Sequence, residues 1–165
     1  MKSFLKQNNK KGFSLIEVLI ACAIISVSIF ALMSASTKGI ELSKQALRQT
    51  QASLLLEEGA EAVKSIRDDS WSNISSLSLN TNYYLTFNTG SNKWSLGTIA
   101  TPNIDSLFTR TIVFSAVNRD SNDDIASSGT LDARTKKISV VVSWPVSGGI
   151  TSTKNLGFYV SDIFN

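Results

Sequence analysis

An apolar run of twenty-one residues, from Phe13 to Met33, restricts what this chain can become more than any other feature of its sequence. As a helix, the run would extend about 31 Å at roughly 1.5 Å per residue, which is enough to cross the hydrocarbon core of a bilayer. The segment before it contains four basic residues and no acid: Lys2, Lys6, Lys10 and Lys11. The positive-inside rule then predicts a single span with a cytoplasmic N-terminus and an extracytoplasmic C-terminal part.

The basic character of the chain belongs to this leader. The whole chain has 16 Lys and Arg against 13 Asp and Glu, with a pI of about 9.1. Without the four leader lysines, the remaining basic side chains are outnumbered by the acidic ones by one. The body is therefore close to neutral, and we expect no nucleic-acid partner.

The residue types that are missing restrict the chemistry. The chain has no histidine, which excludes His-dependent triads and His-ligated metals. Its single cysteine, Cys22, lies in the apolar run and has no partner for an internal disulfide. We therefore expect no enzymatic activity, no catalytic residue and no cofactor.

Two simple interpretations of the apolar run conflict with Glu17. One is a secretory signal peptide cleaved near the small residues of Ala31–Ser36 (ALMSAS), and the other is a plain membrane anchor. The apolar part of a signal peptide is usually shorter than this run and contains no acid. In a spanning helix, a carboxylate costs about 2–3 kcal/mol at mid-bilayer, and it is rarely kept without a partner.

The residues around Glu17 form a specific pattern, Lys10-Lys11-Gly12-Phe13-Ser14-Leu15-Ile16-Glu17-Val18-Leu19-Ile20. This segment resembles the N-terminal cleavage and methylation motif of type IV pilins and pseudopilins, and the similarity extends over residues 10–33. The resemblance implies that a prepilin peptidase cuts between Gly12 and Phe13 and methylates the new N-terminus of Phe13. It also implies that Glu17 guides assembly.

The physical chemistry of these positions agrees with that resemblance. A glycine before the scissile bond leaves the backbone accessible at the membrane surface. Cleavage creates an α-amino group about one helical turn, roughly 6 Å, from Glu17. When subunits pack side by side, the carboxylate of one can meet the amine of its neighbour, so that two costly charges satisfy each other. Small residues such as Ala21 and Ala23 would allow close helix packing.

After Met33 the helical pattern becomes amphipathic. Ile40, Leu47 and Leu54 recur every seven residues, and Leu55, Ala62 and Ile66 lie beside them. The pattern predicts that most of this stripe packs on the chain's own outer domain, and a second interpretation assigns its first turns to the filament core. The predicted helix continues to about Asp68. We interpret Glu57, Glu58 and Glu61 as a solvated face and not as a catalytic carboxylate pair.

Beyond Trp71 the sequence alternates between polar and apolar residues and contains many turn signals. It predicts strands over residues 82–87, 93–96, 109–117, 137–144 and 153–160, with a hairpin at Gly90 and turns over 120–132 and 146–150. Short connections favour an antiparallel meander packed on the helix. The predicted class is α+β, a pilin-like lollipop with a leader (1–12), a spanning helix (13–33), an amphipathic continuation (34–70) and a β domain (71–165).

The loop after residue 119 contains a possible calcium site. Asp120, Asn122 and Asp124 have the 1-3-5 spacing of calcium ligands, but Ile125 and Leu131 replace the glycine and the glutamate of an EF-hand. We favour a polar hairpin loop with Asx turns over a metal site. The aromatic residues have two interpretations, a stacking surface or part of the sheet core, and we favour the core: Trp71, Trp94, Trp144, Tyr83 and Tyr84.

The resemblance also suggests a subclass. Residues 56–68 and 137–144 are similar to minor pilins of the pilus-modification type and to minor pseudopilin I of type II secretion. The expected partners are other pilin or pseudopilin subunits, the prepilin peptidase, the inner-membrane assembly platform and membrane lipid. The expected location is the inner membrane, followed by a pilus or pseudopilus. A membrane-tethered binding module or enzyme that never polymerises is the alternative from another class.

Overall fold

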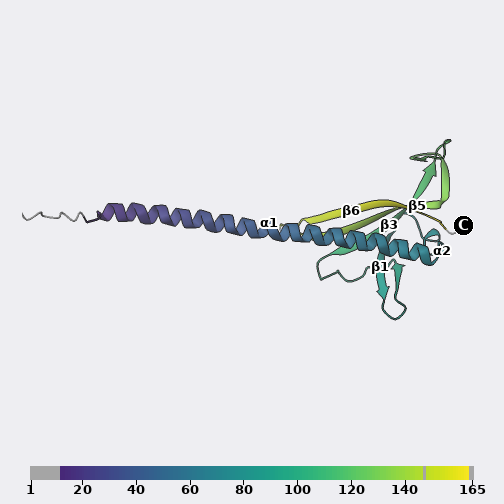
Figure 1. Cartoon of the computed structure of the whole chain (residues 1–165), viewed down its shortest axis with the longest axis horizontal. Helices are drawn as coiled ribbons and strands as arrows, with labels where there is room; N and C mark the ends of the chain where they lie inside the picture. The colour runs from purple at the N-terminus through teal and green to yellow at the C-terminus, as the bar shows by residue number, and fades with distance from the viewer. Residues whose placement is uncertain (1–11, 147, 164–165) are drawn as a thin grey trace, which may run out of the picture. The chain divides into compact units, whose positions relative to one another are not determined.

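The structure is a computed structural model that describes residues 12–146 and 148–163 (Figure 1). Its first element is the helix α1, Leu15–Asp69, which is followed by the short helix α2, Ser72–Ser75. The Ser14 carbonyl opens α1 by accepting the backbone N–H groups of Glu17 and Val18 at 3.0 and 3.2 Å. The chain divides into two compact units at Ala46/Leu47, each described by itself below. The leader lysines, including Lys10 and Lys11, lie outside the described residues.

The described part of the first unit, residues 12–46, contains the apolar portion of α1. It contains an 18-residue window with a mean hydropathy of 2.7, none of it buried, so this helix is long and apolar enough to cross a membrane. The side-chain hydroxyls here donate to the carbonyl one turn earlier in the same helix, at 2.7–3.0 Å, in Ser26, Ser28, Ser34 and Thr37. The helix thereby satisfies these hydroxyls without any neighbour.

The second unit contains an antiparallel sheet in the order β2-β1-β3-β5-β6, with β4 paired to β3 outside this path. The strands are β1 Asn82–Asn88, β2 Lys93–Gly97, β3 Thr109–Arg119, β4 Ile125–Ala126, β5 Thr130–Pro145 and β6 Thr151–Ser161. The predicted α+β class, the antiparallel order and the five predicted strands are confirmed. Pro145 ends β5, because proline has no N–H to extend the ladder.

The segment 120–132, predicted as a turn, is more ordered than expected. It contains β4 and the first residues of β5, so β3 and β5 extend past the main sheet, with the short β4 paired to β3, as an arm that we define as residues 117–135. The register shifts between Ala116 and Val117, where a bulge begins the arm. Gly129 closes it with φ 139°, and a Cβ there would lie only 2.1 Å from the Arg119 carbonyl oxygen, so only glycine fits. Turn-rich composition concealed this pairing.

The core of the second unit lies between the C-terminal part of α1 and one face of the sheet. Helix residues such as Ala52, Leu56 and Val63 are buried against Ile112 and Val140 of the central strands. Ala62 and Ile66 are also buried and Leu55 is partly buried, as predicted.

The prediction was wrong for Leu47 and Leu54, which are both 59% exposed. At about 100° per residue, Leu54 lies about 200° around the helix from the buried Ala52, so the stripe faces away from the sheet.

Candidate functional site

The predicted cleavage and assembly residues lie at the start of α1. Gly12 and Phe13 precede the first helical residue, Leu15, and a Cβ placed on Gly12 would have nothing within 4 Å. Phe13 is 84% exposed. The Gly12–Phe13 peptide bond therefore lies outside helical hydrogen bonding, and the described residues do not cover it.

Glu17 lies in the first turn of α1 and is exposed. It is the only charged residue between Phe13 and Met33. The positive end of the helix dipole favours a carboxylate at this position, although by less than about 1 kcal/mol at an exposed site. That gain is smaller than the cost of placing the charge in lipid, so a cationic partner would still be required to make the position favourable.

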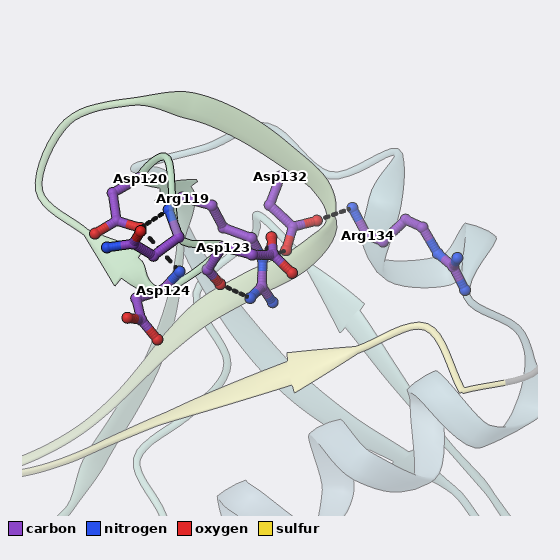
Figure 2. Close-up of polar contacts among 7 residues, drawn as sticks. Arg119, Asp120, Asp123, Asp124, Asp132 and Arg134 are labelled. Carbon is purple, nitrogen blue, oxygen red and sulfur yellow. Dashed lines mark hydrogen bonds and ion pairs between the residues drawn. The ribbon is translucent and has the colours of Figure 1, made fainter.

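The arm of the second unit carries a group of ion pairs around Arg119 (Figure 2). The Arg119 Nε donates to Asp132 Oδ2 at 2.7 Å, and its Nη1 donates to the Asp123 carbonyl, also at 2.7 Å. This bond from Arg119, helped by one from the Thr135 side chain, lowers the pKa of Asp132 from 3.8 to about 2. The guanidinium thus joins the two strands of the arm to its loop.

The three calcium candidates occupy this loop, and Asp120 organises it. Its Oδ1 accepts the backbone N–H groups of Asn122 at 2.8 Å and Asp124 at 3.0 Å, which is the Asx turn that we favoured (Figure 2). Within residues 12–146 and 148–163, no group of three or more His, Cys, Asp or Glu could hold a metal ion. The calcium idea has no structural support beyond the 1-3-5 spacing.

Several open depressions lie on the second unit, and two of them are walled by ion pairs. One, of about 850 Å³, borders the arm and is lined by charged residues of both signs, among them Arg119, Asp132 and Arg134. The other, of about 660 Å³, lies beside the end of α1 and β2, and Asp69 and Lys93 form an ion pair at its wall. Among the described contacts, neither contains a nucleophile hydrogen-bonded to a base.

The aromatic residues mostly belong to the core. Trp144 and Tyr83 are buried, while Trp71 and Trp94 are partly buried against the same cluster. The Trp94 ring is 5.0 Å from the Phe87 ring and 5.7 Å from the guanidinium carbon of Arg110. Because these neighbours already occupy Trp94, it is poorly placed to stack on a base.

Arg110 is a structurally important charge that the sequence did not identify. Its side chain, 6% exposed, donates to the Leu55 carbonyl at 3.1 Å and to Glu58 Oε2 at 2.7 Å. Glu58 is thus exposed, as predicted, and it also holds a buried cation. The signal in the sequence was a charge at an inward-facing position of an alternating strand, Thr109–Arg119, which requires a partner.

Comparison with known proteins supports the N-terminal site. Residues 7–33 match the family model described as the prokaryotic N-terminal methylation motif. No curated protein and no solved structure matches the chain. The match includes Gly12, Phe13 and Glu17, and the fold joins a long N-terminal helix to an antiparallel sheet. Together they indicate a protein of the type IV pilin-like or pseudopilin type, with a helix capable of crossing a membrane.

Proposed function

We propose that this protein is a minor type IV pilin or pilin-like subunit, cut by a prepilin peptidase between Gly12 and Phe13. The observation that carries the proposal is the methylation motif over residues 7–33, which begins an apolar helix with a single carboxylate. In this proposal the protein acts by assembly and display, without catalysis. Its partners are other pilin subunits, the peptidase and the inner-membrane assembly platform.

The mechanism follows from the two charges at the start of the mature helix. The N-methylated amine of Phe13 stays cationic, and Glu17 lies one turn further along the helix. A single subunit in lipid keeps a carboxylate whose desolvation is poorly compensated. Docking beside a neighbour pairs that carboxylate with the neighbour's amine, so the filament is favoured over the isolated subunit. The extracytoplasmic second unit would then be displayed on the surface.

A pseudopilin of type II secretion is the closest alternative, since both classes share this motif and architecture. The preference for a minor pilin rests on the similarity of residues 56–68 and 137–144 to the pilus-modification type. The genes beside this one would separate the two: pilus components support our proposal, and secretin-system components support the alternative.

Mass spectrometry of the mature N-terminus tests the proposal directly. We expect a chain that begins at Phe13 and carries one added methyl group when the prepilin peptidase is present. We also expect Glu17→Ala to be processed normally but recovered in sheared filaments at least about tenfold less, because a tenfold change needs only about 1.4 kcal/mol. The matched control is Glu41→Ala on the same helix, whose exposed pair with Lys38 is worth little. An unmethylated chain that begins at Met1 or near Thr37 would contradict the proposal.

A further inference from the structure

Another depression of the second unit lies beside the arm, on the face of the sheet that turns away from α1. Its volume is about 390 Å³, and residues of β3, β4, β5 and β6 line it. Two of them, Lys137 and Tyr159, are partners in the β5–β6 register. They alternate along their strands with Ile138 and Val160, which are buried in the core, so they point to the opposite face.

The arm supplies one side of this depression. The arm begins at a bulge, and β4 then returns along β3 in antiparallel pairing. Ile125 and Ser127 of this returning segment border the depression, as does Tyr159 of β6. The Ile125 and Tyr159 residues are both 47% exposed. An apolar side chain and an aromatic ring are therefore open to contact from outside the chain.

Lys137 gives this depression a positive charge that no described residue neutralises. It is the only charged residue among the described residues that line the depression, and no described carboxylate forms an ion pair with its ammonium group. In the two depressions walled by ion pairs, by contrast, Arg119 binds Asp132 and Lys93 binds Asp69. An open site with one unpaired cation is complementary to a ligand with an anionic group.

The uncharged polar groups of the depression suit a ligand that carries hydroxyl groups. The Asn118 amide and the Ser127 and Tyr159 hydroxyls can both donate and accept hydrogen bonds, and none of these side chains bonds another described residue. The exposed Tyr159 ring is a flat apolar surface on which the C–H face of a sugar ring can stack. The volume of the depression is within the range of about 300–1,000 Å³ that is typical of small-ligand sites.

We propose that this depression binds an acidic sugar residue of a polysaccharide, with the sugar carboxylate on Lys137 and the sugar ring on Tyr159. Asn118 and Ser127 bind its hydroxyl groups. An acidic peptide fits less well, because it has a carboxylate but no rigid apolar ring face for the tyrosine. The inference goes beyond the proposed function, since all these residues belong to the second unit and none to the N-terminal motif.

Calorimetric titration of the full-length chain in lipid nanodiscs tests the inference. The probe is a short oligosaccharide of galacturonic acid, and the comparison ligands are its uncharged methyl ester and a glutamate oligomer of the same length. We expect saturable binding of the acidic oligosaccharide. Each comparison ligand should bind at least about tenfold more weakly, because the ester lacks the charge that Lys137 binds and the peptide lacks the ring that stacks on Tyr159.

Substitutions in the depression locate the site. Lys137→Gln should weaken binding at least about tenfold, whereas Lys137→Arg should leave it unchanged. Tyr159→Ala should weaken binding at least about threefold, whereas Tyr159→Phe keeps the ring and should leave it nearly unchanged. Lys154→Gln is the matched control, because it removes an exposed lysine of β6 that does not line the depression. Circular dichroism verifies that each variant is folded.

Three outcomes would overturn the inference. The first is the absence of saturable binding, and the second is equal binding of the methyl ester or the glutamate oligomer, which would assign the site to another class of ligand. The third is unchanged binding by folded Lys137→Gln and Tyr159→Ala chains. Processing at Gly12 and the incorporation of Glu17→Ala are measured separately, so the proposed function can stand when this site is rejected.

Discussion

Two arginines of the second unit, Arg110 and Arg119, each have several hydrogen-bond acceptors for their guanidinium. Arg110 is buried, and its guanidinium contacts a carboxylate, a main-chain carbonyl and the Trp94 ring. A buried charge that loses its partner is strongly destabilising. Arg110 is therefore stable in the core because these three contacts are made together. Arg119, nearer the surface, likewise donates hydrogen bonds to a carboxylate, that of Asp132, and to a main-chain carbonyl, that of Asp123.

The lowered pKa of Asp132 predicts a pH dependence. Its pKa falls from 3.8 to about 2 on folding, so the bond to Arg119 contributes its full stability above about pH 4. That stability is lost as the pH falls through 2, and it amounts to about 2 kcal/mol at most. We expect Asp132→Asn to lower the free energy of unfolding at pH 7 and to have a much smaller effect near pH 2, where the Asp132 carboxyl is about half protonated in the folded chain.

Denaturant titrations at both pH values measure this difference. Asp123→Asn is the matched control. The Asp123 side chain is 85% exposed, and its Oδ1 lies 3.6 Å from Arg119 Nε, too far for a hydrogen bond of normal length. An equal effect of Asp132→Asn at pH 7 and pH 2 would show that the ion pair does not set the pKa.

At the scale of elements, one glycine sets how closely the helix approaches the sheet. A Cβ on Gly59 would lie 2.8 Å from Val140 Cγ1 and 3.1 Å from Arg110 Cδ. Both distances are shorter than ordinary van der Waals contact. Gly59 therefore lets α1 lie directly on β3 and β5, at the level where Arg110 reaches Glu58.

Substituting Gly59 by alanine should therefore destabilise the second unit. Alanine gains about 1 kcal/mol of helix propensity, whereas overpacking costs about 1–3 kcal/mol, so we expect a net loss of about 1 kcal/mol in the free energy of unfolding. Gly39→Ala is the control, since nothing lies within 4 Å of a Cβ there. Thermal unfolding of both variants decides, and a more stable Gly59→Ala chain would contradict the crowding.

The elements also show what the sequence could and could not predict. Helix α1 ends at Asp69, one residue beyond the predicted end. Its end could be predicted because helical periodicity and turn residues are properties of neighbouring residues in the sequence. The arm was missed because its pairing depends on a bulge and on one glycine with positive φ, both hidden in a polar segment. The exposure of Leu47 and Leu54 was missed because periodicity does not say which side of a helix meets the sheet.

Across the whole molecule, the core and the apolar run use separate parts of α1. Every helical residue of the core cluster follows Leu47, and the apolar run ends at Met33. The N-terminal motif could be recognised from the sequence because its function depends on contiguous residues. Arg110 and Glu58 are 52 residues apart, and only the fold brings them together.

This separation predicts that the second unit folds without the anchor. A chain that begins at Thr37 keeps the whole core cluster, so we expect it to be water-soluble and to unfold in one cooperative transition. A chain that begins at Val63 lacks Ala52 and Leu56, and we expect it to have no cooperative transition. Circular dichroism during heating measures both. Non-cooperative melting of the longer chain would show that the anchor is needed for folding.

The hydroxyls of the apolar helix have a consequence for how a subunit changes its surroundings. Ser26, Ser28 and Ser34 each donate to a carbonyl of their own helix, at 2.7–3.0 Å. These bonds need not be exchanged when the helix leaves lipid for a bundle of neighbours, so the transfer is isoenthalpic with respect to them. Such a surface requires no hydrogen bonds of fixed direction from a neighbouring helix, so one helix can slide along another. The axial position of one subunit beside the next would then be set by Glu17.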